Sequence, residues 1–181
     1  MTRLFLGIPI SPSIKEELLH FKEAQTAYTG VKWTAEEKLH ITAYFFAEVA
    51  EEMLENLKSL LYIALKDQSS FDLEFEKYEL APPRQAARMI WARFKKSERF
   101  ISLHEEVHAL YSQIEKPIQR RKKPIPHITL ARLKDQAPRE REDYTWKYSC
   151  KDLSVDKLIL WQSSLQPEGS IYEALEEYTL S

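Results

Sequence analysis

The stretch Leu39-His40-Ile41-Thr42 decides the fold, because its His40-Ile41-Thr42 recurs 87 residues later as His127-Ile128-Thr129. Each copy lies in a run of apolar and β-branched residues that is typical of a β-strand. No linker or low-complexity tract separates the two copies. Their spacing is close to half of the 181-residue chain, which predicts two similar lobes that each contribute one strand to a shared cleft.

The two motifs present the same side chains to one side of a strand. Because side chains alternate along a strand, His40 and Thr42 point to one face and Ile41 to the other. The same alternation pairs His127 with Thr129. Each motif therefore offers an imidazole and a hydroxyl on one face and an apolar anchor on the opposite face.

This pair of motifs predicts acid–base chemistry on a phosphate diester without a metal. Opening a cyclic phosphate requires a base that takes a proton from water and an acid that protonates the departing oxygen. Two histidines with pKa values near neutrality can do both, and two threonine hydroxyls can hold the non-bridging phosphate oxygens. The residues alone do not decide which histidine is the acid.

The rest of the chain predicts an α+β fold with helices on largely antiparallel sheet. Helical spacing of apolar residues predicts three helices, over residues 14–28, 51–66 and 98–115, the first capped by Ser11 or Ser13. Alternating or β-branched runs predict strands over residues 3–8, 31–33, 39–49, 71–80, 89–94, 127–133, 157–164 and 171–180.

Composition narrows the class of protein. The formal charge of -2 excludes a basic coat for bulk nucleic-acid packaging, and three glycines exclude a glycine-rich phosphate loop. The single cysteine permits no intrachain disulfide, which suits the reducing cytoplasm. No apolar run approaches the length of a membrane span, so we expect a cytoplasmic protein without a membrane partner. A monomer is the default expectation.

The chain resembles the RNA 2',3'-cyclic phosphodiesterase family, also called 2'-5' RNA ligases, of the two-histidine phosphoesterase superfamily. The resemblance covers essentially the whole chain. It is carried by Arg3-Leu4-Phe5-Leu6-Gly7-Ile8-Pro9, by Val31-Lys32-Trp33 leading to Leu39-His40-Ile41-Thr42, by Pro126-His127-Ile128-Thr129-Leu130-Ala131-Arg132, and by Leu165-Gln166-Pro167-Glu168-Gly169 followed by Tyr172.

The resemblance implies a bilobal, pseudo-twofold-symmetric fold in which two mainly antiparallel sheets form a central cleft, with helices outside. Residues 1–181 then form a single domain of two interleaved lobes. It also implies hydrolysis of RNA 2',3'-cyclic phosphate ends to 2'-phosphates, and allows the reverse 2'-5' ligation, without a cofactor or metal. Carried over by position, His40 is the proton donor and His127 the proton acceptor.

Two neighbouring features bear on the substrate. Arg132 resembles the arginine that closes the second motif in the family and is expected to bind phosphate, although strict alternation puts it on the face opposite His127 unless the strand bends. Tyr44 stands where the family has a lysine, which removes a positive charge near the first motif. The cluster Arg120, Arg121, Lys122 and Lys123 is either a solvated loop or an RNA-attracting patch.

Two other functions stay open. A non-catalytic RNA-binding module would keep the cleft without turnover, although lysine or arginine would serve binding equally well. His104, Glu105 and His108 match the helical H-E-x-x-H zinc-peptidase pattern. The extended form of that pattern is absent, because Tyr111 and Ile114 stand at the positions of its glycine and third histidine.

Overall fold

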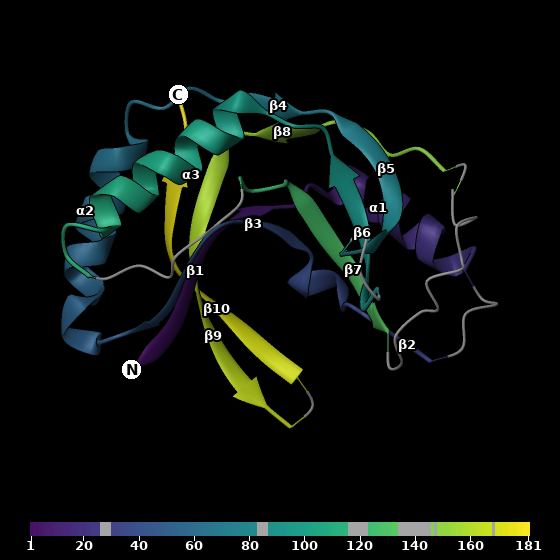
Figure 1. Ribbon diagram of the computed structural model, residues 1–181, viewed down its shortest axis with the longest axis horizontal. Helices are drawn as coiled ribbons and strands as arrows, with labels where there is room; N and C mark the ends of the chain where they lie inside the picture. The colour runs from purple at the N-terminus through teal and green to yellow at the C-terminus, as the bar shows by residue number, and fades with distance from the viewer. Residues whose placement is uncertain (26–29, 83–86, 116–122, 134–145, 147, 168) are drawn as a thin grey trace.

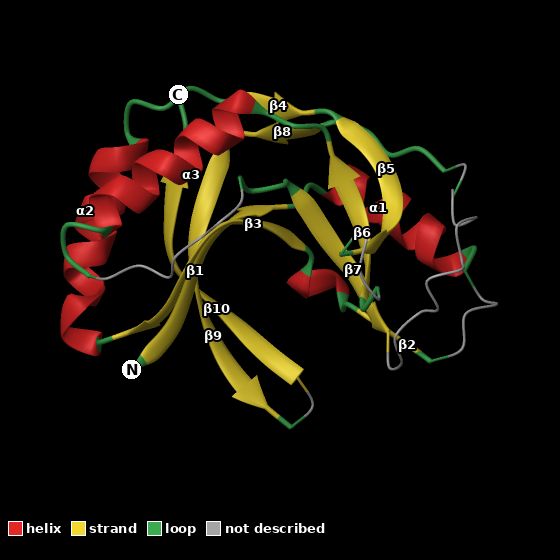
Figure 2. Ribbon diagram, viewed as in Figure 1, coloured by secondary structure: helices red, strands yellow, loops and turns green. Residues whose placement is uncertain are grey.

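A computed structural model describes residues 1–25, 30–82, 87–115, 123–133, 146, 148–167 and 169–181. Arg120, Arg121 and Lys122 lie outside the described residues. The predicted α+β class is confirmed (Figure 2). The elements are, in order, β1 (Thr2–Pro9), α1 (Pro12–Glu23), β2 (Val31–Trp33), η1 (Glu36–Lys38), β3 (His40–Val49), η2 (Glu51–Met53), α2 (Leu54–Leu65), β4 (Phe71–Leu73), β5 (Phe75–Ala81), β6 (Met89–Phe94), α3 (Glu98–Tyr111), β7 (His127–Leu133), β8 (Leu153–Val155), β9 (Lys157–Gln166) and β10 (Gly169–Thr179).

Some element bounds differ from the prediction. All three helices are shorter than predicted, and the run 71–80 is divided between β4 and β5. Strand β8, which pairs with β4 in a small sheet of two strands, was not predicted. Among the described residues, no helix is long and apolar enough to cross a membrane.

The strands of the two motifs meet at the centre of one antiparallel sheet. Its order is β10-β9-β1-β3-β7-β6-β5, and β2 also pairs with β7 (Figure 1). Strands β3 and β7 are joined in register at Ile41 and Ile128, both fully buried. The two predicted sheets are therefore two halves of a continuous sheet, which meet between the histidine and the threonine of each motif.

A β-bulge follows each motif at the same position. Between β1 and β3 the register skips Ala43, and between β6 and β7 it skips Leu130, in each case the third residue after the histidine. A bulge adds one residue to one strand and so reverses the faces of the residues beyond it. Phe45 on β3 and Arg132 on β7 consequently return to the face that carries the motif side chains.

The helices cover the two halves of the sheet in a crossed manner. Helix α1 is capped by the Ser11 side chain, which accepts a hydrogen bond from the Ile14 backbone N–H, and its Phe21 ring stacks on Tyr78 of β5 with centroids 3.8 Å apart. Helix α1 thus follows β1 in sequence but packs on the half that contains β7.

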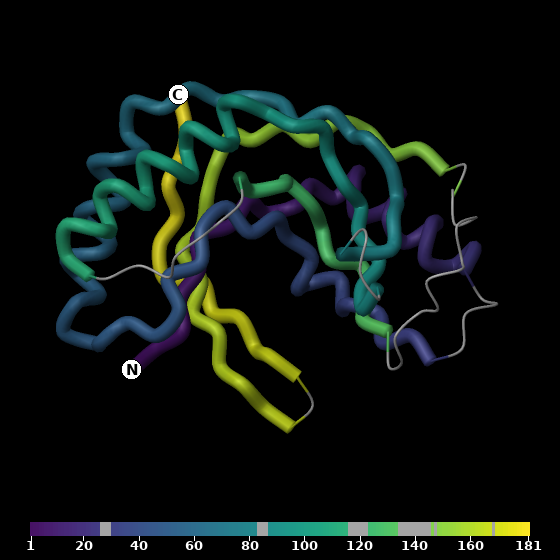
Figure 3. Tube along the Cα trace, in the orientation of Figure 1, coloured from purple at the N-terminus to yellow at the C-terminus, as the bar shows by residue number. Residues whose placement is uncertain are grey.

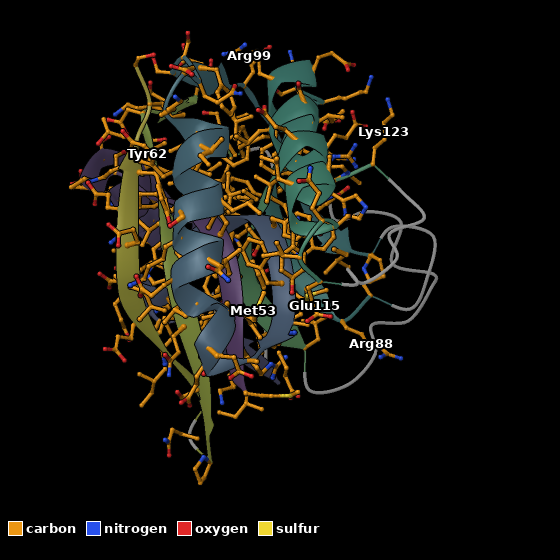
Figure 4. The ribbon with its side chains drawn as sticks, turned by 90° about the vertical axis from the view of Figure 1, so that its left-hand side faces the viewer. Met53, Tyr62, Arg88, Arg99, Glu115 and Lys123 are labelled. Carbon is orange, nitrogen blue, oxygen red and sulfur yellow. The ribbon has the colours of Figure 1, made fainter. Side chains whose placement is uncertain are left out.

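Helices α2 and α3 lie together on the other half, as Figures 1 and 4 show. Helix α3 follows β6 but packs against β3, while the Tyr178 hydroxyl of β10 donates a hydrogen bond to the Lys58 carbonyl of α2. Figure 3 shows the purple N-terminal strand beside the yellow-green strand β9, so distant parts of the chain complete each half.

Candidate active site

A cavity of about 500 Å³ lies where the two halves of the sheet meet. It contains all five residues that the sequence predicted for the site: His40, Thr42, His127, Thr129 and Arg132. Its lining has no acidic residue among those described. The other lining residues come from the segment around β2 and η1 and from the β9–β10 hairpin: Lys32, Trp33, Thr34, Ala35, Lys38, Gly169, Ser170 and Tyr172.

The imidazole of His40 is held in one tautomer by the backbone before it. Its Nδ1 lies 2.7 Å from the Lys38 carbonyl oxygen. Because a carbonyl oxygen only accepts hydrogen bonds, Nδ1 carries a proton and Nε2 is the nitrogen that can exchange one. Nε2 lies 3.2 Å from the Thr42 hydroxyl oxygen, so the two polar groups of the first motif are in contact.

The imidazole of His127 is held in the same way. Its Nδ1 lies 2.8 Å from the Ile125 carbonyl oxygen, again the residue two positions earlier. This hydrogen bond gives His127 the same tautomer, with Nε2 available for proton exchange. The symmetry of the two motifs therefore extends from the sequence to the backbone anchor and the protonation of each ring.

Different aromatic side chains surround the two rings. The His127 ring stacks on Trp91 of β6, with centroids 3.7 Å apart and planes inclined by 23°. The His40 ring lies farther from Phe5, at 4.8 Å and 33°, and meets the edge of Tyr172 at 5.4 Å. Aromatic contacts of this kind fix the planes of the imidazoles within the cavity.

Burial lowers the pKa of both histidines, because it disfavours the charged imidazolium. For His40, the Lys38 carbonyl opposes this effect, while the charge of His127 reinforces it. For His127, the Ile125 carbonyl and the Glu79 carboxylate raise the pKa, and Arg93 lowers it. Both rings are therefore driven toward the neutral form in the free protein.

Arg132 reaches the cavity because of the bulge in β7. Alternation alone places it opposite His127, but the bulge at Leu130 returns it to the same face, in register with Lys32 of β2 and Met89 of β6. Burial raises the pKa of the Tyr172 hydroxyl, and the positive charges of Arg132 and Arg3 oppose this. Arg132 therefore adds positive charge beside the motif residues, near the β9–β10 hairpin.

The residues of the zinc-peptidase pattern hold α3 against the back of β3. His104 Nδ1 lies 2.9 Å from the Ala43 carbonyl oxygen, the residue at the bulge, and His108 Nδ1 lies 2.9 Å from the Tyr44 hydroxyl. Glu105 is exposed. Within the described ranges, no group of three or more His, Cys, Asp or Glu side chains is placed to hold a metal ion.

The same contacts change the interpretation of Tyr44. Its side chain is only 2% exposed and packs among His104, His108 and Tyr111 under α3. It lies on the face of β3 opposite His40, so it does not line the cavity. The absence of a lysine here therefore affects the packing of α3 rather than the charge of the site.

Sequence patterns missed Trp91 and Lys32 as parts of the site. Both lie in predicted strands, and their position beside a motif follows from register: Trp91 pairs with Thr129, and Lys32 pairs with Arg132. Single-strand periodicity cannot supply that register. Of the two, Lys32 lines the cavity, while Trp91 stacks on the His127 ring.

Comparison with known proteins finds relatives that match nearly the whole chain. The model of the 2'-5' RNA ligase superfamily matches residues 10–166. An RNA 2',3'-cyclic phosphodiesterase of Methanocaldococcus jannaschii is 30% identical over 180 residues, which cover 97% of this chain and 99% of the relative.

Solved structures have the same fold. TT0787 of Thermus thermophilus superposes with a TM-score of 0.86 at 25% identity, covering 98% of this chain and 97% of that one. LigT of E. coli complexed with 3'-AMP has a TM-score of 0.76 at 21% identity, covering 99% and 98% of the two chains.

Proposed function

The chain belongs to the 2'-5' RNA ligase superfamily, and from this premise we propose that it hydrolyses RNA 2',3'-cyclic phosphate ends to 2'-phosphates. The observation that carries the proposal is the pair of histidines in one cavity, each fixed by a backbone carbonyl in the tautomer that leaves Nε2 to exchange a proton. A binding module needs no such matched pair, because permanently charged side chains bind phosphate equally well.

The reaction balances with these two groups and water. Nε2 of His127 takes a proton from water as the water oxygen bonds to phosphorus. His40 enters this step as the imidazolium, with a proton on each ring nitrogen. The bond between phosphorus and O3' breaks, and His40 donates its Nε2 proton to O3'. The product is a 2'-phosphate with a free 3'-hydroxyl. One histidine has gained a proton and the other has lost one, and exchange with solvent restores the starting state.

The other predicted residues stabilise charge on the phosphate. The hydroxyls of Thr42 and Thr129 donate hydrogen bonds to the non-bridging oxygens, where negative charge sits in the transition state. Arg132 binds the phosphate or its nucleotide from the end of the cavity near Lys32. The same acid and base run the reverse 2'-5' ligation when a ribose hydroxyl replaces water and the reaction is driven backward.

The proposal includes the setting in which the protein acts. Residues 1–181 act as one domain, because β1 pairs with β9 and the helices cross between the halves of the sheet. The protein acts as a monomer in the cytoplasm on RNA or nucleotides with a 2',3'-cyclic phosphate. Its single cysteine suits a reducing compartment.

The test is hydrolysis of a 2',3'-cyclic-phosphate oligoribonucleotide in EDTA, with identification of the product end. His40→Ala and His127→Ala should each lower kcat by roughly 10²- to 10⁴-fold, since each removes one proton-transfer group. His20→Ala, at an exposed histidine of α1, is the matched control and should retain wild-type turnover.

Two results would contradict the proposal. Wild-type protein that binds the RNA but does not turn it over would instead be a binding module. Activity that appears only when zinc is added, and is lost in His104→Ala, would instead favour a zinc site at the H-E-x-x-H segment.

A further inference from the structure

The aromatic residue that stacks on His127 is Trp91, on the neighbouring strand. Trp91 is in register with Thr129 of β7 and with Glu79 of β5. Its indole therefore lies on the cavity face of the sheet, and the His127 ring stacks on it with centroids 3.7 Å apart. Residues in register on adjacent strands share a face, so this contact is built into the sheet rather than into a loop.

The indole at this position carries a cost that packing does not explain. Trp91 Nε1 is buried and has no hydrogen-bond partner among the described residues. A buried N–H without a partner destabilises the folded state. A phenylalanine would supply an aromatic ring without that donor, so the feature that distinguishes tryptophan here is its larger and more electron-rich ring face.

That face lies against the group that gains positive charge in the reaction. The face of an aromatic ring is negative and attracts cations, and indole attracts them more strongly than the other aromatic side chains. His127 becomes an imidazolium when its Nε2 takes the proton of water. We propose that Trp91 is a positioning residue for His127, whose indole face fixes the imidazole plane and stabilises the imidazolium form.

The charged groups around His127 do not perform this role by themselves. Those that act on its charge are His40 on β3, Glu79 on β5 and Arg93 on β6, and the cations Lys32, Lys38 and Arg132 line the same cavity. Glu79 favours the imidazolium, but it is ion-paired with Lys77 at 3.1 Å and with Arg93 at 3.3 Å. Since His40 and Arg93 oppose a second positive charge, the indole face acts together with the Ile125 carbonyl, the other uncharged group that favours the imidazolium.

The direction of a pKa change separates this inference from a purely structural role. Burial lowers the pKa of His127. If Trp91 only excludes water, replacing it hydrates the ring and raises that pKa. If the indole face stabilises the imidazolium, replacing it lowers the pKa. The two roles therefore predict opposite signs for the same substitution.

The experiment is an NMR pH titration of the histidine ring signals in the free protein, for wild type, Trp91→Phe and Trp91→Leu. We expect Trp91→Leu to lower the pKa of His127 by roughly 0.4 to 1.5. Trp91→Phe keeps a weaker ring face and should give a value between those of leucine and wild type. The pKa of His40 should change by less than that of His127.

A matched control is Trp161→Phe, the same substitution beside the other histidine, whose ring centroid lies 5.7 Å from that of His40. It should leave the pKa of His127 unchanged. If Trp91→Leu does not fold, Trp91→Phe decides alone. An unchanged or raised pKa of His127 in a folded Trp91 variant would overturn the inference, as would an equal change at both histidines.

The kinetic counterpart rests on the proposed function, whereas the titration needs no substrate. With His127 as the base, the acid limb of kcat/KM against pH should move to lower pH in Trp91→Phe, by the same amount as the pKa. If the wild type does not hydrolyse the RNA end, the proposed function fails. The titration still tests the role of Trp91, because it reports the pKa of His127 without substrate. If the wild type hydrolyses the RNA end, but Trp91→Phe leaves both the acid limb of kcat/KM and the pKa of His127 unchanged, only the inference about Trp91 is contradicted.

Discussion

Replacing Gly7 by alanine should damage the site more than it damages the fold. Gly7 lies in the middle of β1, between β3 and β9. A Cβ atom at this position would lie 2.7 Å from Trp161 Cζ3 and 3.0 Å from the Ile41 carbonyl oxygen. Both separations are shorter than van der Waals contact, so an alanine here forces one or both neighbours to move.

The neighbours that must move are parts of the site. Ile41 stands between His40 and Thr42 and is in register with Ile128 across the join of the two halves. The Trp161 ring lies 5.3 Å from Phe5, centroid to centroid, and Phe5 packs on His40. A shift of either neighbour therefore changes the distance between the first motif and the second.

The expected magnitudes follow from overpacking and from misplacement of catalytic groups. Overpacking a buried site costs about 1–3 kcal/mol of stability, which lowers Tm by roughly 3–10 °C for a chain of this size. Misplacing a catalytic group by about 1 Å costs on the order of 10²-fold in rate. Gly7→Ala should therefore lower kcat/KM by roughly 10- to 100-fold at a temperature where the variant is fully folded.

The assay is hydrolysis kinetics with a thermal melt, for Gly7→Ala, Trp161→Phe and the double variant. Because phenylalanine removes ring atoms that the new Cβ would strike, the double variant should recover part of the lost rate, with a coupling energy above about 0.5 kcal/mol. Gly30→Ala is the control: Gly30 has a φ of 78° and nothing within 4 Å of an added Cβ, so stability should fall while turnover stays.

Wild-type kcat/KM in a Gly7→Ala variant with a lowered Tm would refute this reasoning. It would mean that β1 absorbs the strain without passing it to Ile41. Additive effects in the double variant would show that Trp161 does not receive the strain.

Three further predictions concern the faces of the central strands. Tyr44→Phe removes the hydrogen bond to His108 and should lower stability by about 0.5–1.5 kcal/mol. Because Tyr44 faces α3, KM should stay within about twofold of the wild-type value, and a large change in KM would contradict that placement. Arg132→Ala should raise KM and lower the slope of log KM against log salt by about 0.7, and an unchanged slope would exclude a phosphate contact. Burial lowers the pKa of both histidines below the ordinary value of 6.5, so the proton donor is lost as pH rises through its lowered pKa. A plot of kcat/KM against pH should therefore peak below about pH 6.5. A plot of kcat should peak at higher pH, because the bound phosphate anion raises the pKa of both histidines.

The sequence predicted the motif strands well because their pattern is local. Alternation of His40, Ile41 and Thr42 correctly placed the two polar side chains on one face and the apolar anchor on the other. The apolar stripe of each helix likewise identified the helices, and Ser11, one of the two predicted cap residues, caps the first. Such features depend only on neighbours in the chain, so periodicity suffices.

The bulges explain what alternation missed. Ala43-Tyr44 and Leu130-Ala131 are each two consecutive buried residues within a strand, which is the visible trace of a bulge. That pattern places Tyr44 in the core and returns Arg132 to the cavity. A pair of apolar residues in sequence does not by itself decide between a bulge and a strand buried on both faces, so the sequence left the position of Arg132 unresolved.

The remaining differences depend on pairing between distant segments. The contact between Trp91 and His127 requires the register of β6 against β7, and β8 has only three residues and pairs with β4. Neither the register nor so short a strand has a local signature. Both are set by pairing between segments that lie far apart in the sequence.

The position of Tyr172 of β10 beside His40 has a consequence for biosynthesis. His40 is enclosed by Phe5 of β1 and by Tyr172 of β10, and the latter leaves the ribosome 132 residues after His40. At about 5–20 residues per second, that interval is roughly 7–26 s. Throughout it the nascent chain is surrounded by ribosomal and transfer RNA while its own cavity is still open on one side. A protein that acts on RNA ends thus completes its site only after β10 has been translated.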